Sequence, residues 1–176
     1  MEDVRNIMSL EFKSNSDHIF LIGKVVEDIA SSEYLVKYHK IEASPAPYFN
    51  LDEEFNLHKC VSNIIAKKLI NAAHDCADGG LFVSLVEMAM SSNLGCEIST
   101  QKTIRKDAFL FGESQGRVLV TVKSEQLDSF KSEIELSGVT YVSLGKVTTD
   151  ANIVIDNISF GSVDSLKEIS ENVINL

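Results

Sequence analysis

The sequence has few cysteines and no long hydrophobic run. Its three cysteines, Cys60, Cys76 and Cys96, are widely separated and form no CxxC pair. An odd number at such spacing predicts reduced thiols rather than a disulfide scaffold or a zinc site. The longest apolar stretches fall far short of the about 20 residues that a membrane-spanning helix needs. The N-terminus has no basic segment followed by an apolar one. We therefore expect a cytoplasmic protein without a membrane partner.

Basic residues are also scarce, since 16 lysines and arginines stand against 26 aspartates and glutamates, for a net charge of −10. A nucleic-acid partner is disfavoured, because binding to the phosphate backbone requires a cationic surface. A small phosphorylated ligand stays compatible, since a few backbone amides and one arginine can hold a phosphate. The 176 residues are 44% hydrophobic and 24% charged. This composition is typical of one globular domain with a buried core.

Proline occurs only twice, at Pro45 and Pro47, and both lie in a linker-like stretch at residues 42–50. Proline is excluded from the interior of helices and central strands. We expect residues 1–17 to be a remnant of a preceding module and residues 18–176 to form the domain proper. Asn50 and Glu53 have the spacing of a capping box, which predicts a helix from there to about residue 71.

The remaining pattern predicts alternating strands and helices. Strands are expected at 18–23, 96–99, 117–123, 139–144 and 152–155, and helices at 80–92, 124–138 and 163–174. The β-α-β-β-α order over residues 117–175 resembles part of a ferredoxin-like arrangement. With the earlier helices on the other face, the sequence predicts an α/β (α+β) fold in which helices sandwich a mixed β-sheet.

A first candidate site is the polar turn at residues 73–80, which opens into an apolar helix. Asp78 is placed to be the N-cap of that helix, and Gly79 and Gly80 would let a ligand approach the backbone. Bare amides at a helix start bind phosphate, so these three residues form our predicted nucleotide or phosphate site. His74 and Asp75 would shape the turn. A purely structural role of the same residues, as cap and turn, is favoured by the local sequence alone.

A second candidate lies at residues 110–117, directly before a predicted interior strand. Glu113 and Arg117 are expected to shape the loop, either by pairing with each other or with Arg117 facing a phosphate. Ser114 falls in a G-x-S-x-G pattern, but a nucleophile elbow needs a strand before the serine and a helix after it. We predict no catalytic residue. We also predict no metal site, and the acidic residues of both segments are expected to cap or shape the loops.

Three ordered motifs carry a family resemblance. Residues 73–89, AHDCADGGLFVSLVEMA, resemble HD-x-SDGGL-x-VAL-x-EMA of the phosphoribosylformylglycinamidine synthase family (large, or second, subunit), a member of the aminoimidazole-ribonucleotide-synthetase-related superfamily. Residues 110–117, LFGESQGR, are similar to its second signature. Residues 31–34, SSEY, are similar to its GGSEY stretch, which follows an L-x-G strand. Cys76 and Ala77 depart from the usual small or hydroxyl residues, and Ser31 and Ser32 replace glycines. Only the last C-terminal module of the family is matched.

The resemblance implies part of an ATP-dependent carbon–nitrogen ligase of purine biosynthesis. Such an enzyme converts formylglycinamide ribonucleotide, glutamine and ATP into formylglycinamidine ribonucleotide. It implies ATP and Mg²⁺ as cofactors of the whole enzyme. Its partners would be the missing N-terminal modules, a glutaminase subunit or domain and a small-molecule nucleotide. The chain is expected to be a fragment that is inactive alone.

The resemblance further implies that Asp78, Gly79 and Gly80 border a phosphate-bearing ligand. Alternatives are another superfamily member (aminoimidazole ribonucleotide synthetase, selenophosphate synthetase or thiamine-monophosphate kinase) or a free-standing, non-catalytic nucleotide-binding domain.

Overall fold

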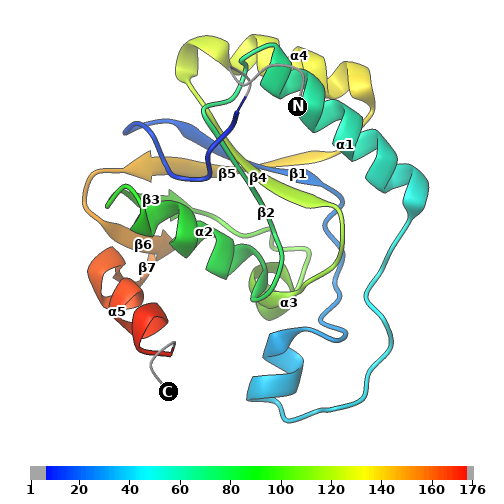
Figure 1. Cartoon of the computed structure of the whole chain (residues 1–176), viewed down its shortest axis with the longest axis vertical. Coiled ribbons are helices and arrows are strands. Elements are labelled where there is room, and N and C mark those ends of the chain that lie inside the picture. Colours follow the sequence, from blue (N-terminus) through cyan, green and yellow to red (C-terminus); the bar gives the residue numbers. More distant parts are fainter. Residues whose placement is uncertain (1–6, 174–176) are drawn as a thin grey trace.

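The computed structural model describes residues 7–173 and has a seven-stranded sheet between two layers of helices (Figure 1). The strands are β1 (His18–Gly23), β2 (Ala72–Asp75), β3 (Gly95–Ile98), β4 (Arg117–Val122), β5 (Tyr141–Thr148), β6 (Asn152–Ile155) and β7 (Ile158–Ser162). The helices are α1 (Leu51–Ala66), α2 (Gly80–Met90), α3 (Lys106–Phe111), α4 (Leu127–Ser137) and α5 (Val163–Val173), with a π-helical turn at Tyr34–Tyr38 and a 3₁₀ turn at Ser124–Gln126. Across residues 7–173, every helix is too short or too polar to cross a membrane.

The strand order is β2-β4-β1-β5-β3-β6-β7. Both β4 and β5 pair antiparallel with β1, so they run parallel to each other with β1 inserted between them. Because α4 connects β4 to β5, these elements form the split β-α-β unit of ferredoxin-like folds. The parallel pairing of β3 with β6 makes the sheet mixed. The predicted fold class is confirmed.

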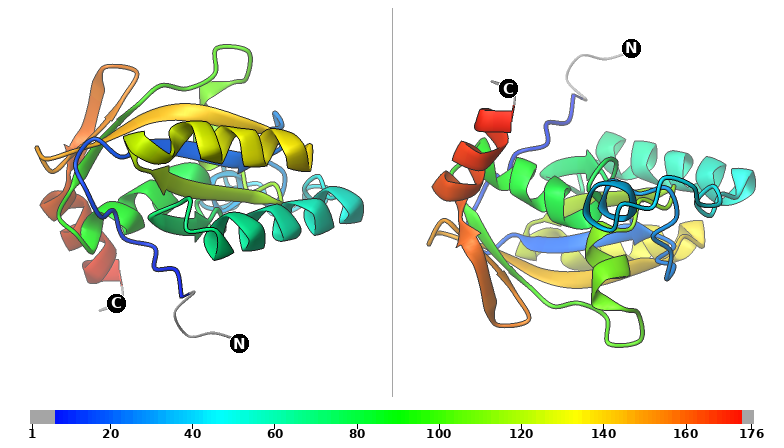
Figure 2. Two further views of the ribbon diagram at one scale, coloured as in Figure 1. Left: turned by 90° about the horizontal axis from the view of Figure 1, so that it is seen from above. Right: turned by 90° about the horizontal axis from the view of Figure 1, so that it is seen from below.

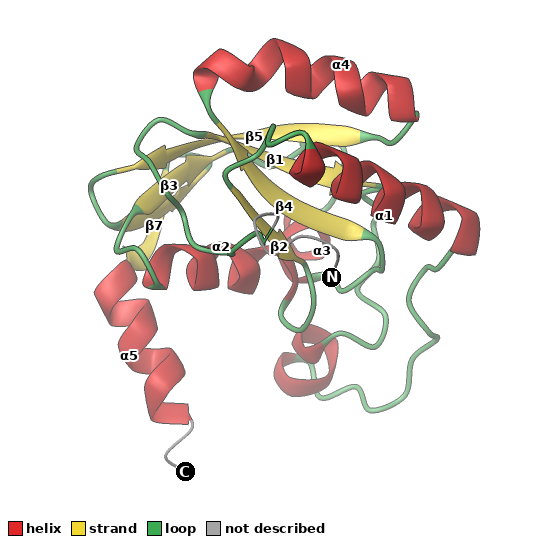
Figure 3. Ribbon diagram, turned by 45° about the horizontal axis from the view of Figure 1, so that its top comes forward, coloured by secondary structure: helices red, strands yellow, loops and turns green. Residues whose placement is uncertain are grey.

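Helices cover both faces of the sheet, and each face has its own core. Figure 3 shows α1 and α4 on one side and α2 on the other. In β1, Phe20 and Ile22 pack in the cluster under α1 and α4, whereas Ile19 and Leu21 belong to the cluster under α2. Successive side chains of a strand point to opposite faces of the sheet. An interior strand between two helical layers therefore has apolar side chains on both faces. Figure 2 shows α5 beside the β6–β7 hairpin at one end of the sheet.

Helix α1 is shorter than predicted and ends at Ala66 instead of about residue 71. Lys68 adopts a left-handed φ of 55°, which stops the helix. The N–H of Leu69 then donates back to the carbonyl of Ile64 and satisfies the end of the helix. A local backbone reversal of this kind has no strong sequence signal when the residue is not glycine.

The predicted capping box at the start of α1 is half confirmed. The side chain of Asn50 accepts hydrogen bonds from the N–H groups of Asp52 and Glu53, as expected for an N-cap. The predicted reciprocal hydrogen bond, from the backbone N–H of Asn50 to the Glu53 side chain, is wrong. The Glu53 carboxylate binds Lys24 and Tyr48 instead. Two partners from the preceding loop thus replace the local backbone partner.

The N-terminal arm packs on the same core as the sheet. Phe12 is 1% exposed, and its N–H donates to the carbonyl of Met88 in α2. Residues 1–6 lie outside the described residues, and a module boundary at residue 17 stays a prediction. The stretch 42–50 has irregular backbone, and its role as a linker stays a prediction. It belongs to a long excursion between β1 and α1, which extends away from the sheet in Figure 1.

Candidate functional site

The three motif segments meet at one carboxylate. Oε1 of Glu113 accepts hydrogen bonds from the backbone N–H groups of Glu33 and Gly79, both at 2.8 Å. Residue 33 belongs to the excursion after β1, and residue 79 belongs to the turn before α2. Hydrogen bonds to an ionised acceptor are about twice as strong as neutral ones. Glu113 therefore fastens the segments 31–34, 73–80 and 110–117 to one another.

Aromatic contacts also join the segments 31–34 and 110–117 to helix α2, which follows the segment 73–80. The ring of Tyr34 stacks on Phe111 with centroids 5.1 Å apart and an interplanar angle of 19°. Phe111 in turn contacts Phe82 of α2 edge to face at 5.6 Å. Offset-stacked and edge-to-face geometries are the favourable ones for aromatic pairs. The cluster is thus held by an apolar side as well as a polar side.

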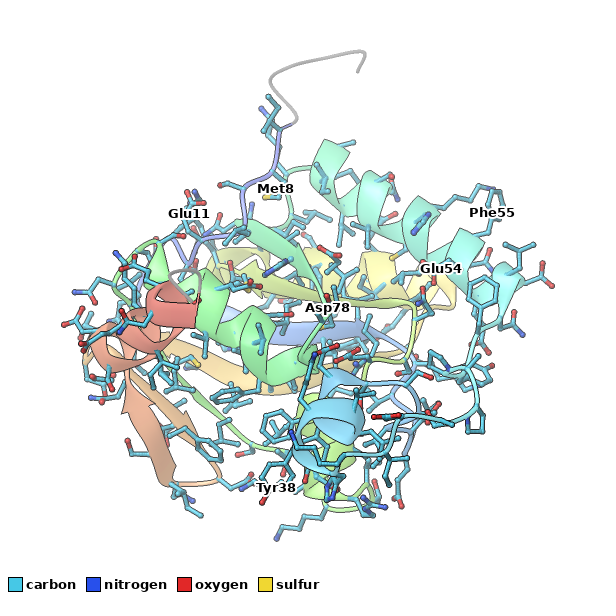
Figure 4. All side chains as sticks on the ribbon, turned by 60° about the horizontal axis from the view of Figure 1, so that its bottom comes forward. Met8, Glu11, Tyr38, Glu54, Phe55 and Asp78 are labelled. Carbon is cyan, nitrogen blue, oxygen red and sulfur yellow. The ribbon has the colours of Figure 1, made fainter. Side chains whose placement is uncertain are left out.

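A cavity of about 360 Å³ opens beside this cluster. Its wall combines the excursion, α1, the end of β2 with the turn that follows it, and the loop before β4. Figure 4 labels Glu54 and Asp78, which both line it. The lining residues that the argument uses are Ser31, Glu54, Asp75, Asp78, Glu113 and Arg117.

The cavity is predominantly acidic. Four carboxylates line it, and the basic side chains in its wall are Arg117 and His58. One oxygen of Glu54 lies 2.9 Å from Nε2 of His58, but the exposed carboxylates of Asp75 and Asp78 would repel a phosphate that entered alone. A ligand whose phosphates already carry a divalent cation would instead be attracted.

Arg117 is 3% exposed, and its guanidinium holds the backbone of its own loop. Its Nε donates to the carbonyl of Ser114 at 3.2 Å, and Nη2 donates to the carbonyl of Gly112. Burial lowers the pKa of the guanidinium below its ordinary value. Within residues 7–173 no ion pair joins Arg117 to Glu113, so the predicted pairing of these two side chains is wrong. Each of them binds backbone groups instead.

The predicted N-cap at Asp78 is also wrong. Gly79 is the N-cap residue of α2, with a left-handed φ of 78° and no side-chain cap. The N–H of Gly79 itself donates to Glu113, which belongs to another segment. The Asp78 carboxylate is exposed at the rim of the cavity and makes no hydrogen bond or ion pair with any residue in the described range.

Gly80 is buried against the end of α3. It has a φ of 66°, and a Cβ at this position would lie 2.5 Å from the carbonyl oxygen of Gly112 and 2.9 Å from that of Leu110. Its own N–H donates to the carbonyl of Ala77. Both glycine amides therefore have protein partners, and the interpretation of Gly79 and Gly80 as bare anion-binding amides is wrong. That the two glycines border a ligand stays a prediction.

His74 and Asp75 lie on the edge strand β2 and not in the predicted turn. Nε2 of His74 lies 2.7 Å from a carboxylate oxygen of Glu87 in α2, and Nδ1 lies 3.4 Å from Asp75. His74 therefore ties the strand to the helix and shapes the start of the turn. The side chain of Asp75 is 79% exposed and lines the cavity.

Neither nucleophile candidate fits the cavity chemistry. Burial raises the pKa of the Cys76 thiol to about 11, so the thiol stays protonated at neutral pH. Ser114 is buried between α3 and β4. A helix precedes it and a strand follows it, which is the reverse of a nucleophile elbow. That the chain has no catalytic residue stays a prediction.

Ser31 and Glu54 line the cavity but were not predicted as site residues. Glu54 lies in the first turn of α1, where the sequence alone indicates only that an acidic residue complements the helix dipole. Ser31 belongs to the SSEY stretch, which resembles the family, but its residue type alone did not indicate a binding or catalytic role. Only the folded chain places both side chains at the same opening.

Comparisons with known proteins agree with the resemblance of the three motifs. Residues 16–157 match the family model described as AIR synthase related protein, C-terminal domain. The chain is 35% identical over 147 residues to the phosphoribosylformylglycinamidine synthase subunit PurL of Alkaliphilus metalliredigens, and 34% identical over 146 residues to that of Moorella thermoacetica. These matches cover 84% and 83% of this chain but 20% of each relative. The chain spans about one fifth of the length of the curated relatives it matches.

Solved structures share the fold. Thermotoga maritima PurL complexed with FGAR matches with a TM-score of 0.78 and 14% identity, over 93% of this chain and 30% of that one. The same protein complexed with ATP matches with a TM-score of 0.70 and 14% identity, over 93% and 27%. The thiamine-monophosphate kinase of Stenotrophomonas maltophilia matches with a TM-score of 0.58 and 17% identity, over 85% and 53%. At these identities the likeness shows the fold alone.

Proposed function

Because this chain belongs to the family of AIR synthase related proteins, whose C-terminal domain it contains, we propose that it works as the last module of a phosphoribosylformylglycinamidine synthase. In this role it serves an ATP-dependent carbon–nitrogen ligase of purine biosynthesis in the cytoplasm. Glutamine supplies the nitrogen through a separate glutaminase. The family predicted from the three motifs is confirmed by the family match. The activity, substrates and partners rest on the likeness to the synthase relatives.

The observation that carries this proposal is the convergence of the three motif segments on Glu113, beside an open cavity. The cluster presents fixed carboxylates and backbone from four segments at one surface. Ligases of this kind work by positioning reactants and neutralising charge, without a nucleophile from the protein. A surface that offers carboxylates but no nucleophile suits one wall of a site that another module completes.

The cavity fits a magnesium–nucleotide complex better than a free ion or a free phosphate. Among residues 7–173 no group of three or more His, Cys, Asp or Glu side chains could hold a metal. Magnesium bound to a nucleotide needs only one or two protein carboxylates in addition to the phosphates. Asp75 and Asp78, both exposed on the rim, would supply them. The bound magnesium would neutralise the phosphates of ATP.

An assembly experiment tests this proposal. The 147-residue part of the A. metalliredigens subunit that aligns with this chain would be replaced by the matching part of this chain. The chimera would be given formylglycinamide ribonucleotide, ATP, Mg²⁺ and ammonia. We expect formation of the amidine product. A folded chimera that forms no product, while the parent subunit does under the same conditions, would contradict the proposal.

The competing function is a free-standing nucleotide-binding domain, and the isolated chain separates the two. As one wall of a shared site, the isolated chain should bind ATP·Mg²⁺ with a dissociation constant well above the micromolar range. Calorimetric titration measures this directly. Micromolar binding by the isolated chain would favour the free-standing domain and count against a shared site.

Asp78→Asn should reduce nucleotide use without reducing stability. In the chimera we expect kcat/KM for ATP to fall at least about tenfold, since the nucleotide-bound cation loses one anionic carboxylate ligand. In the isolated chain the free energy of unfolding should stay within about 0.5 kcal/mol, because the side chain has no partner in the fold. Glu42→Gln, at an exposed acid outside the helices and outside the cavity, is the matched control and should change neither quantity. Unchanged kcat/KM in Asp78→Asn would show that this carboxylate does not face the nucleotide.

A further inference from the structure

The excursion between β1 and α1 returns to the domain through a segment with little backbone support. Figure 1 shows the excursion leaving the sheet after β1 and coming back to α1. Residues 28–33 form its first limb, and residues 44–48 form its second limb. Among the described residues no backbone–backbone hydrogen bond joins the two limbs. Side chains therefore hold the second limb in place.

The carboxylate of Asp28 joins the two limbs. Its Oδ1 accepts from the N–H of Ala30 at 2.8 Å, and its Oδ2 accepts from the N–H of Tyr48 at 2.9 Å. The first contact is the local turn that aspartate commonly makes with the residue two positions on. The second contact spans 20 residues of the chain. Because hydrogen bonds to a carboxylate are about twice as strong as neutral ones, Asp28 is well suited to hold a segment that has no backbone pairing.

The first limb is fixed to the body of the domain. A Cβ on Gly112 would lie 2.3 Å from the backbone carbonyl oxygen of Asp28, so the two backbones are in close contact. Gly112 directly follows α3 and belongs to the motif segment 110–117. The N–H of Glu33, farther along the limb, donates to Glu113. Asp28 thus connects the second limb to a point that is already anchored.

The other contacts of the second limb are more exposed than those of Asp28. The N–H of Ser31 donates to Oγ of Ser44 at 2.7 Å. The hydroxyl of Tyr48 lies 3.0 Å from the carboxylate of Glu53 and 2.9 Å from the ammonium of Lys24. These groups lie at the surface, where water competes for them, whereas both contacts of Asp28 are partly buried. Asp28 is therefore the main connection of the second limb.

Both limbs contribute to the wall of the acidic cavity. Ser31 lines it from the first limb and Pro47 from the second. Pro47 directly precedes Tyr48, whose amide Asp28 holds. Asp28 itself does not line the cavity. Its effect on a ligand there would thus pass through the position of the second limb.

We propose that Asp28 is a positioning residue of the acidic cavity, which holds the second limb against the first and so keeps the wall at Ser31 and Pro47 in place for the ligand. This inference rests on the proposed function, since the ligand is the magnesium–nucleotide complex. When a binding-competent arrangement is only partly populated, the apparent dissociation constant rises in inverse proportion to its population. A bound ligand restores the wall. Loss of Asp28 therefore raises KM for ATP and spares kcat.

Amide hydrogen exchange in the isolated chain tests the joining of the limbs. Residues 26–50 contribute no side chain to either hydrophobic core, so Asp28→Ala should leave the sheet folded. In this variant the amides of Ala30 and Tyr48 should exchange at least about tenfold faster. The amide of Glu33, which Glu113 holds, should keep its protection and so separate release of the second limb from a general loss of structure. Unchanged exchange at Tyr48 would overturn the proposal.

Steady-state kinetics test the effect on the site. A chimera would carry residues 16–157 of this chain, the range that the family model matches, in the A. metalliredigens subunit. Asp28→Asn should raise KM for ATP at least about fivefold and change kcat by less than about twofold. Glu42→Gln, at an exposed acid in the same excursion, is the control and should change neither quantity. Unchanged KM in Asp28→Asn, or a fall in kcat without a rise in KM, would overturn the proposal.

The two experiments separate this inference from the proposed function. A parent chimera that forms no product would count against the proposed function. The exchange of the Tyr48 amide would still decide whether Asp28 joins the limbs, because it is measured in the isolated chain without any ligand.

Discussion

Replacing Gly80 by alanine is expected to lower the free energy of unfolding by about 2–5 kcal/mol. Its left-handed backbone costs an ordinary residue roughly 1–2 kcal/mol. The added methyl group would also meet the carbonyl oxygens of Gly112 and Leu110 at 2.5 and 2.9 Å. Both are backbone atoms and cannot rotate away, and overpacking typically costs about 1–3 kcal/mol. Urea unfolding followed by circular dichroism measures the change.

Gly138→Ala is the matched control for that substitution. Gly138 has a similar φ of 71°, but a Cβ there would meet nothing within 4 Å. It should therefore pay only the backbone cost, about 1–2 kcal/mol. The difference between the losses in unfolding free energy of the two variants measures the contact of the turn with the end of α3. Equal losses would show that Gly80 is needed only for its backbone angle.

Replacing Arg117 by methionine should cost about 2–4 kcal/mol. The guanidinium satisfies the carbonyls of Gly112 and Ser114 in a buried loop. A buried polar group left without its partner costs about 1–3 kcal/mol. Methionine retains most of the apolar stem, so the loss reports mainly on those two hydrogen bonds. Thermal and urea unfolding would both show it.

Arg105→Met provides the comparison for Arg117. Arg105 is also paired, with Asp107, but its side chain is 56% exposed. Exposed ion pairs contribute about 0–1 kcal/mol, so this variant should remain within that range. If Arg117→Met were equally mild, the guanidinium would not be what holds the loop before β4.

The layered fold was predictable because its signals are strong and local. The strand of β1 is apolar on both sides, and α2 is apolar over most of its surface, which together indicate a sheet between helices. The strand β2 was missed because its sequence, Ala72–Asp75, has little strand propensity. It is a strand because β4 pairs with it along its whole length. The six-residue α3 and the β7 strand, Ile158–Ser162, were also missed, since short elements carry little periodic signal.

The candidate site was predictable in some of its residues but not in its contacts, and the predicted residues His74, Gly79 and Gly80 do not line the cavity. The motif segments named Asp78, Glu113 and Arg117, and all three line one cavity. Their contacts depend on which distant backbone groups the fold brings to each side chain. The partners of Glu113 are Glu33 and Gly79, which are 80 and 34 residues away in the chain. Local reasoning could only pair Glu113 with its neighbour Arg117, and it therefore missed the role of Glu113 in joining the three segments.

Amide hydrogen exchange in Glu113→Ala tests this joining role most directly. If the carboxylate holds the three segments together, the amides of Glu33 and Gly79 should both lose at least about tenfold in protection, since each loses a charge-assisted hydrogen bond. Glu87→Ala, which removes only the contact with His74, should leave both amides protected. Full protection of Gly79 and Glu33 in Glu113→Ala would contradict the central claim that this carboxylate assembles the wall of the site.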